Sequence, residues 1–402
     1  MAHLESNDFF YPQQHGFRKH LSCETQLAEF IHDLLESMDN SLQIDAIFLD
    51  YSKAFDRVPH SHLLQKLSSL GIPANLIRWI KNFLSGRKQF TSANDSHSPL
   101  TNVTSGVPQG AGLSPLLFLI YINDLPCNIK SKLRLFADDC VIYREIRTTN
   151  DSCLLQSDLN TLASWSNKFL LPLNISKCKS MTFTRKHTVN QHQYSIGSLL
   201  ITPALSYRYL GLHLTPSLSW VTHIQNICAE ASRTLGYLRR NLKAASPEIK
   251  QLAYITFIRP KLEYASSVWH PSQAYLATDL EAVQNRAIRF ITSCYSKKSS
   301  ITALRQSIAI PSLMSRRIIS RLCLLHHFYY HPRTRHAKLQ PPHRTSSRLN
   351  HNHSIARINC RTLALNSSFF PDAIVVWNAL PNTILSCTDR KSFRIKLNDH
   401  LS

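Results

Sequence analysis

The sequence predicts an α+β fold in which the N-terminal half mixes strands with helices and the C-terminal half is helical. Up to about residue 214, apolar runs of strand length alternate with segments whose apolar residues recur at helical spacing. After Pro216 only the helical spacing continues. A chain of 402 residues is long enough for two or three domains, and its 9 Gly exclude collagen-like and Gly-rich linker classes.

The first expected elements are a strand and two helices. Residues 46–49 form an apolar run that ends at Asp50, which is typical of a buried strand. Residues 61–70 and 75–84 show helical spacing, and the breaker sequence Gly-Ile-Pro at 71–73 separates them.

A further helix and a strand pair are expected next. Ser114 is in position to cap a helix with apolar residues at 117, 120 and 121. Two strand-like runs, 133–136 and 141–143, flank a segment with two adjacent aspartates. The sequence therefore predicts a β-hairpin with two carboxylates at its tip.

The remaining elements complete the mixed half and begin the helical half. Apolar residues recur at helical spacing over 155–169, and residues 181–183 and 210–214 are candidate strands. Further on, apolar faces of the helical type run through 224–238 and 280–291.

The charge balance predicts a polyanionic partner, most simply nucleic acid. The chain has 46 Lys and Arg against 25 Asp and Glu, a net charge of +21. Residues 301–402 hold 15 Lys and Arg against 3 Asp and Glu, which gives this segment +12. Within it, residues 332–353 are rich in Pro, Arg, Ser and His and predict an exposed linker.

The sequence indicates an intracellular protein, nuclear or cytoplasmic, with no membrane span. The N-terminus shows no apolar core flanked by basic residues, so no signal peptide is predicted. The longest apolar stretch, 113–122, is interrupted by Ser and Pro and is about half the length that spans a membrane. The 10 Cys are scattered without a C-x-x-C pair, which fits reduced thiols.

Three carboxylates predict a metal site. Asp138 and Asp139 are adjacent at the expected hairpin tip, and Asp50 ends another apolar strand. If these strands pair side by side, Asp50 and Asp138 converge at one end of the sheet. Mg²⁺ takes oxygen ligands and keeps several waters, so one or two carboxylates plus substrate phosphates suit it. The alternative for an Asp pair taken alone is a solvated turn.

Five segments, in order, resemble the reverse transcriptase of non-LTR retrotransposons of the jockey-like or long interspersed element type. They are FLDYSKAFDRVPH (48–60), SGVPQGAGLSPLLFLIYINDLP (105–126), LRLFADDCVIY (133–143), WSNKFLLPLNISKCKSMTF (165–183) and YRYLGLHL (207–214). Upstream, QHGFRKHLSCETQL (14–27) resembles a segment that precedes the catalytic core. Five motifs in the family's order are highly specific.

The resemblance implies a polymerase right hand. Residues 1–214 would be the palm, an antiparallel sheet with helices and a remnant of the fingers. Residues 215–300 would be the helical thumb, followed by a basic C-terminal region, 301–402. Most of the fingers would be missing, as in an N-terminally truncated copy. The implied function is RNA-directed DNA polymerase, and the alternative is a non-catalytic nucleic-acid-binding remnant.

The resemblance also assigns the catalytic residues and partners. Asp50 and Asp138 would bind metal, with Asp139 as the partner of the pair and two Mg²⁺ ions, or Mn²⁺ in their place, as cofactors. Lys177 would lie near the triphosphate and protonate pyrophosphate as a general acid, with Lys179 as its rival. The implied partners are an RNA template, a DNA primer and deoxynucleoside triphosphates.

Eight residues are implied to bind substrate: Tyr51, Phe55, Gly106, Pro108, Gln109, Gly110, Leu210 and Gly211. The backbone carbonyl of Tyr51 would reach a metal. Phe55 would lie under the incoming sugar and exclude a 2′-hydroxyl by bulk. An RNA-synthesising polymerase is disfavoured by this Phe and by Ala137, where Gly usually precedes the Asp pair.

The remaining substrate residues would shape the backbone around the nucleotide and the primer. Gln109 would contact the templating pair or the incoming nucleotide. Gly106 and Gly110 would let the backbone approach closely. Leu210 and Gly211 would shape the grip on the primer terminus.

Two polar clusters beyond the palm have structural alternatives. Arg233, Arg239, Arg240 and Lys243 follow the apolar stripe of the implied thumb and would contact phosphates, or form a solvated basic helix face. Cys323, His326, His327 and His331 have the spacing of one helix face. Because structural zinc needs two close pairs on separated segments, the sequence favours an apolar helix over a zinc site there.

Overall fold

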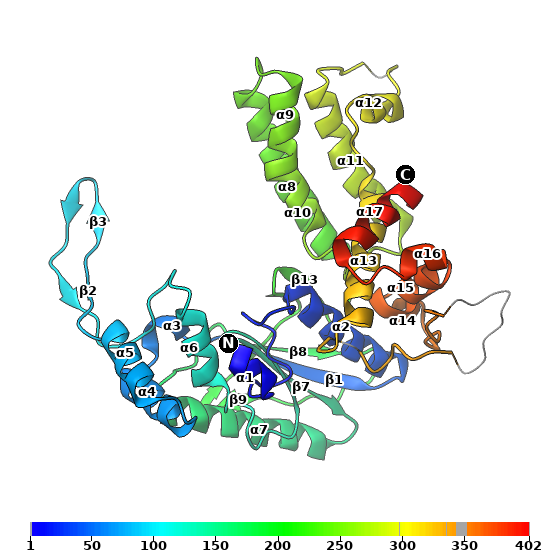
Figure 1. Ribbon diagram of the computed structural model, residues 1–402. Helices are drawn as coiled ribbons and strands as arrows, with labels where there is room; N and C mark the ends of the chain where they lie inside the picture. Colours follow the sequence, from blue (N-terminus) through cyan, green and yellow to red (C-terminus); the bar gives the residue numbers. More distant parts are fainter. Residues whose placement is uncertain (1, 297, 335, 343–351, 402) are drawn as a thin grey trace. The chain divides into compact units, whose positions relative to one another are not determined.

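The chain forms two compact units in the computed structural model, which describes residues 2–296, 298–334, 336–342 and 352–401 (Figure 1). The first unit comprises residues 1–26 and 41–205, and the second unit comprises 27–40 and 206–402. The predicted mixture of helix and sheet is confirmed, with the large sheet in the first unit. No helix in the described part of the chain has the length and apolar character that crossing a membrane requires.

The first unit contains helices from 4 to 20 residues long, one five-stranded sheet and several two-stranded pairs. Its helices are α1 (Ala2–Ser6), α3 (Ala54–Arg57), α4 (His60–Ser69), α5 (Ala74–Leu84), α6 (Ser114–Ile122) and α7 (Thr149–Lys168). Its strands are β1 (Gln43–Leu49), β2 (Lys88–Gln89), β3 (Ser92–Ala93), β4 (Ser96–His97), β5 (Thr101–Asn102), β6 (Lys132–Phe136), β7 (Asp139–Ile146), β8 (Lys179–Phe183), β9 (Ser195–Ile196), β10 (Leu199–Leu200) and β11 (Thr202–Pro203).

The five-stranded sheet has the order β11-β8-β1-β7-β6, with β1 in the centre. β1 is antiparallel to both β7 and β8, and all seven of its residues are buried. The buried carboxylate of Asp45 on this strand accepts hydrogen bonds from Gln43, Thr182 and Tyr194, so its burial is satisfied. The predicted strand over 46–49 and the predicted hairpin are both confirmed as β1 and β6–β7.

The predicted cap at Ser114 is wrong. Ser114 is the first residue of α6, Leu113 occupies the cap position, and no side chain caps the helix. The Ser114 hydroxyl is buried without a hydrogen-bond partner among the described residues. Pro115 in the first turn presets a helical backbone, and burial of nearly the whole helix supplies the stability that a cap would add.

A ribbon that the sequence pattern did not indicate follows α5. β2 pairs with β5 and β3 pairs with β4, and every residue in these four strands is exposed. Figure 1 shows the ribbon extending beyond α5 as a narrow hairpin. Its strands are two residues long and polar, which leaves almost no alternation to detect.

The second unit is helical apart from one short hairpin. It takes residues 27–39 of α2 (Cys23–Asp39) and the strands β12 (Tyr207–Tyr209) and β13 (Leu212–Leu214). Its other helices are α8 (Val221–Asn241), α9 (Pro247–Ala253), the π-helix η1 (Tyr254–Ile258), α10 (Arg259–Glu263), α11 (Ala274–Ile291), α12 (Ile301–Ser307), α13 (Leu313–Tyr330), α14 (Leu363–Asn366), α15 (Phe369–Asn378), α16 (Asn382–Leu385) and α17 (Arg390–Leu401).

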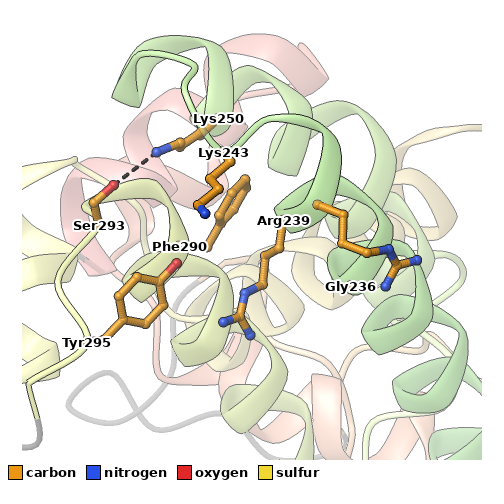
Figure 2. Close-up of a pocket in the computed structure, with 8 residues that line it drawn as sticks. Gly236, Arg239, Lys243, Lys250, Phe290, Ser293 and Tyr295 are labelled. Atoms are coloured by element: carbon orange, nitrogen blue, oxygen red, sulfur yellow. Dashed lines mark hydrogen bonds between the residues drawn. The ribbon is translucent and has the colours of Figure 1, made fainter.

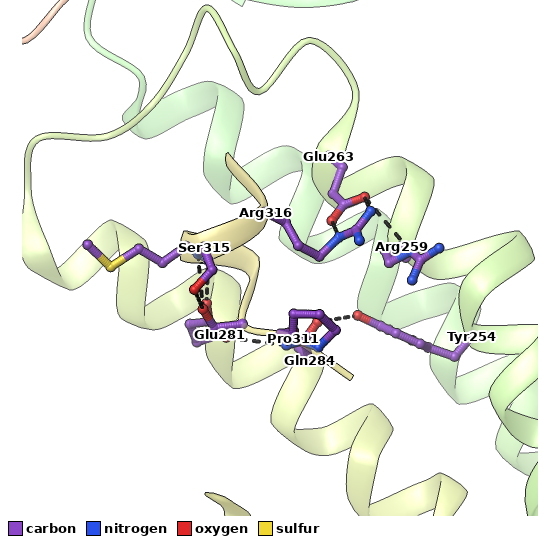
Figure 3. Close-up of polar contacts among 10 residues, drawn as sticks. Tyr254, Arg259, Glu263, Glu281, Gln284, Pro311, Ser315 and Arg316 are labelled. Carbon is purple, nitrogen blue, oxygen red and sulfur yellow. Dashed lines mark hydrogen bonds and ion pairs between the residues drawn. The ribbon is translucent and has the colours of Figure 1, made fainter. Parts of the chain in front are cut away.

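Polar contacts tie α13 to the helices before residue 300 (Figure 3). The Arg316 guanidinium donates to both carboxylate oxygens of Glu263. Gln284 on α11 accepts a hydrogen bond from Tyr254 at 2.5 Å and donates to the carbonyl of Pro311 at 3.0 Å. The predicted boundary at 300 stays a prediction, and these bonds join the chain on its two sides into one compact unit.

The predicted linker over 332–353 lies partly outside the described residues, which omit 335 and 343–351. Its described part is largely exposed or half-buried, with Thr334 and Leu339 as buried exceptions, so the linker stays a prediction. Leu339 is 2% exposed, and Lys338 forms an ion pair with Glu36 of α2. Apolar burial within this Pro-rich and Arg-rich stretch holds it against the unit.

Candidate active site

Strand register brings the three predicted aspartates together. β1 pairs with β7 so that Leu49 lies opposite Cys140, and Asp50 follows Leu49 directly. In the β6–β7 hairpin, Phe136 lies opposite Asp139, so Ala137 and Asp138 form its tip. The predicted convergence at one end of the sheet is therefore present in the fold.

The carboxylates at this end repel one another. Desolvation and then the negative charges of Asp138 and Asp50 raise the pKa of Asp139 to about 6. The pKa of Asp138 is raised by desolvation and by the charge of Asp50, against an opposing backbone hydrogen bond. A nearby cation would remove this repulsion.

The donor chemistry fits a divalent metal held by few protein ligands. Carboxylate oxygens are hard ligands, and a Mg²⁺ site needs only one or two of them when substrate phosphates contribute the rest. Among the described residues, no group of three or more His, Cys, Asp or Glu side chains is placed to hold a metal ion. Asp50 and Asp138 would supply the two carboxylates of such a site.

Lys177 lies beside Asp50 because the loop before it is pinned to the end of β1. Asn174 donates its backbone N–H to the carbonyl of Asp50 at 2.7 Å. The Lys177 ammonium then lies 3.8 Å from the Asp50 carboxylate, and both side chains are partly exposed. Its rival Lys179 lies on β8 opposite Phe48, one strand position before the end of β1.

Gln14 clamps the turn that presents the aspartates, and sequence reasoning missed it. Its side-chain oxygen accepts hydrogen bonds from the backbone N–H groups of Gly16 and Ala137, each at 2.8 Å. Its side-chain nitrogen donates to the carbonyl of Ala137 at 3.2 Å. Gln14 is 2% exposed, so these bonds are made away from water.

Two backbone features explain why this clamp is needed. Ala137 has a φ of +56°, the left-handed region that Gly usually occupies, so its turn needs external support. A Cβ on Gly16 would lie 2.2 Å from the Ala137 nitrogen, so only Gly fits there. Gln14 and Gly16 belong to the QHGFR segment that the sequence singled out. The sequence alone could not show that this segment lies beside the Asp pair.

Phe55 is held in place by aromatic neighbours. It stacks on the buried Phe118 of α6, with ring centroids 4.3 Å apart and planes 17° apart. The exposed ring of Phe17 contacts its edge at 6.0 Å. Tyr51, at the other predicted substrate position on this segment, is 4% exposed, and its ring is part of the core. The ring of Tyr51 is thus not available to a ligand.

The segment from Ser105 to Gln109 packs against α3 and lines part of a cavity of about 780 Å³. Pro108 and Gln109 are among the lining residues, and Gln109 donates to the Asp56 carboxylate at 3.0 Å. Gly106 has a φ of +81°, and a Cβ there would lie 2.5 Å from the carbonyl oxygen of Asp56. A close approach is therefore required at Gly106.

Gly110 makes no close approach to other described residues, and the approach of its backbone to a substrate stays a prediction. No atom lies within 4 Å of a Cβ built on Gly110. Its φ of +84° still favours Gly, so the requirement there is conformational.

Leu210 and Gly211 belong to the second unit, where they form the turn between β12 and β13. Their φ angles are +43° and +84°, so the predicted strand over 210–214 is confirmed only from Leu212 onward. The Tyr264 hydroxyl donates to the carbonyl of Leu210 at 3.0 Å, and its ring closes the space beside Gly211. The residues that were predicted to grip the primer terminus thus form a tight turn that Tyr264 holds in place.

The segment with Cys323, His326, His327 and His331, for which the sequence favoured an apolar helix, lies on α13 and its C-terminal end. Cys323 and His326 lie on α13, where both are buried. A ring nitrogen of His326 is 2.7 Å from the carbonyl of Cys387, and its ring stacks on Phe393. This part of α13 packs as a core helix, as the sequence favoured.

Comparisons with known proteins match the N-terminal part of the chain to one family and a longer stretch to curated relatives. Residues 1–214 match the family model described as reverse transcriptase (RNA-dependent DNA polymerase). The chain is 29% identical over 296 residues to the probable RNA-directed DNA polymerase from transposon BS of Drosophila melanogaster, covering 70% of this chain and 32% of that protein. It is 28% identical over 292 residues to the RNA-directed DNA polymerase from mobile element jockey of the same species, with 69% and 32% covered.

Solved structures give a weaker likeness. Apo telomerase from Candida tropicalis aligns with a TM-score of 0.44 and 12% identity, covering 83% of this chain and 53% of that chain. The chain spans about a third of the length of the curated relatives it matches. The family match and these relatives confirm the resemblance to non-LTR retrotransposon proteins, and the chain belongs to the reverse transcriptase (RNA-dependent DNA polymerase) family.

Proposed function

We propose that this chain extends a DNA primer on an RNA template by two-metal nucleotidyl transfer, with deoxynucleoside triphosphates as substrates. The observation that carries the proposal is the convergence of Asp50, Asp138 and Asp139 at one end of the sheet. The mutual repulsion expressed in the raised pKa values of Asp138 and Asp139 supports a role in cation binding.

Asp50 and Asp138 would hold the metal ions, with the backbone carbonyl of Tyr51 as a further oxygen ligand. Bound Mg²⁺, or Mn²⁺ in its place, supplies activation of the primer hydroxyl and stabilisation of the leaving pyrophosphate. Asp139 adds negative charge beside these ligands and strengthens the attraction for the ions.

The side chains around the carboxylates orient the nucleotide. Phe55, fixed by its stack on Phe118, blocks the space that a 2′-hydroxyl would need. Gln109 and the backbone at Gly106 line the adjoining cavity and contact the base pair being formed. The Lys177 ammonium donates a proton to the departing pyrophosphate oxygen.

Primer extension with purified full chain tests the proposal directly. A DNA primer annealed to RNA is incubated with Mg²⁺ and deoxynucleotides, and Asp138→Ala serves as the inactive control. Binding of the primer–template is measured in parallel by fluorescence anisotropy. Extension by the wild type and its loss in Asp138→Ala is the expected result. Binding without extension by the wild type contradicts catalysis and favours a non-catalytic nucleic-acid-binding remnant.

A further inference from the structure

A cavity of about 670 Å³ in the second unit is lined by cations (Figure 2). Its walls come from the last turns of α8, from α9, and from the end of α11 with the loop that follows. The four cationic lining residues are Arg239, Arg240, Lys243 and Lys250. No lining residue is acidic, and the ion pairs among the described residues involve none of these four.

The cationic residues of this cavity are stabilised by a helix end and by neutral groups, not by carboxylates of the described residues. Arg239 and Arg240 lie in the last turn of α8, where the helix dipole stabilises cations and offsets part of their repulsion. Lys250 is 5% exposed, and its ammonium donates to the Ser293 hydroxyl at 2.9 Å. The ammonium also lies over the Phe290 ring, 5.5 Å from its centroid, so both of its partners are neutral. An anion in the cavity would offset the cost of burying this charge.

The loop after α11 is built to complete the cavity. Ser293 has a φ of +53°, at a position after the helix end where Gly is usual, and this backbone brings its hydroxyl to Lys250. Arg289 donates to the carbonyl of Ser296 at 2.8 Å and so fixes the loop that carries Tyr295.

Tyr295 gives the cavity an aromatic surface. The residue is 54% exposed, and Arg239 lies over its ring at 5.4 Å. Figure 2 shows Tyr295, Arg239 and Lys243 around one common space. An exposed aromatic ring beside cations that have no acidic partner is the combination that binds unpaired nucleotides, because the cations attract phosphates and the free face of the ring stacks on a base.

We infer that this cavity binds a single-stranded segment of nucleic acid, with its phosphates at the four cations and an unpaired base on Tyr295. The ring favours a single strand over a duplex, whose bases are already stacked and paired. The cavity is also much larger than one phosphate ion. This site goes beyond the proposed polymerase function, since binding here needs neither the aspartates nor a metal.

The test measures binding of the full chain to a fluorescein-labelled single-stranded RNA dodecamer in EDTA, over a series of salt concentrations. The variant Arg239→Ala/Lys243→Ala is compared with Lys391→Ala/Arg394→Ala, which removes the same charge from exposed positions on α17. We expect the cavity variant to raise the Kd about tenfold more than the control. For this variant the slope of log K against log salt concentration should be less steep by about 1.4, because two phosphate contacts with the single strand are lost.

A second pair of variants tests the unpaired base. Tyr295→Ala should weaken binding of the single strand about tenfold, and Tyr295→Phe should not, because it keeps the ring. Binding of the matching RNA duplex should be the same for both variants. Equal weakening by the cavity and control variants, or equal loss of single strand and duplex in Tyr295→Ala, overturns the inference. The assay contains no metal ion and no deoxynucleoside triphosphate. Its result therefore does not depend on whether the chain has polymerase activity.

Discussion

The first unit has a cluster of carboxylates at the end of its sheet, and the second unit has a cluster of cations around a cavity. The two clusters are built differently. Asp50 and Asp138 are placed by strand register and by a clamped turn, so their carboxylates occupy defined positions. Arg239 and Lys243 extend from the end of a helix on long side chains. Defined placement suits chemistry at a single atom, whereas flexible cations suit attraction to a polyanion.

The largest expected effect follows from removing a carboxylate. Asp50→Asn should lower primer extension about a thousandfold or more, because the amide is neutral and binds a divalent cation weakly. The measurement is single-nucleotide extension at saturating Mg²⁺. Asp95→Asn, a change of the same kind at an exposed position on the ribbon, should leave the rate unchanged. A rate for Asp50→Asn close to the wild type would refute the difference drawn between the two clusters.

The next effect concerns the choice of sugar. Phe55→Val should reduce the preference for deoxynucleotides over ribonucleotides by about a hundredfold, because the smaller side chain leaves room for a 2′-hydroxyl. The ratio of kcat/KM for dCTP to that for CTP measures it. Phe90→Val, at an exposed ring on the ribbon, is the matched control. If the ratio for Phe55→Val equals that of the control, Phe55 is a packing residue only.

The clamp on the hairpin tip predicts a smaller, structural effect. Gln14→Ala removes three buried hydrogen bonds and leaves the backbone at Ala137 unsatisfied, which should cost about 2 kcal/mol in the free energy of unfolding. Urea denaturation measures this loss. Gln65→Ala, at an exposed position on α4, is the control. An equal loss in both variants would show that Gln14 has no special role.

The sequence predicted the local parts of the active site and missed the contacts that hold them. The hairpin with Asp138 and Asp139 follows from two apolar runs around one short turn, so it could be predicted. The side chain of Gln14 crosses to a residue 123 positions away, and no local pattern carries that information. Pairing of β1 with β7 was anticipated only as a condition, since register between distant strands depends on the whole sheet.

The same limit applies to the second unit. Arg239, Arg240 and Lys243 were visible as basic residues on one predicted helix. Lys250, Ser293 and Tyr295 join them only through the packing of α9 and α11, so the cavity could not be predicted. The left-handed backbone at Ser293 is equally hidden, because the sequence there lacks the Gly that usually signals it.

The smallest expected effect comes from the charge repulsion among the aspartates themselves. The pKa of Asp139 is about 6 in the folded chain, above its ordinary value of 3.8, so the folded state holds this proton more tightly than the unfolded state. Its contribution to stability is therefore greatest below about pH 4 and declines as the pH rises to about 6. Desolvation raises this pKa although the Asp139 residue as a whole is exposed, and solvent screening limits the change to about 1 kcal/mol.

Asp139→Asn removes this contribution and the repulsion on Asp138. Relative to the wild type, the variant should gain about 1 kcal/mol at neutral pH in EDTA and nothing below about pH 4. Urea denaturation at the two pH values measures the difference in the free energy of unfolding between the variant and the wild type. The effects of the other carboxylates cancel in this difference, because both proteins contain them. Millimolar Mg²⁺ should shrink the gain at neutral pH, because a bound cation removes the repulsion in the wild type as well. A gain that is the same at both pH values, or one that Mg²⁺ leaves unchanged, would mean that the aspartates do not share a cation site.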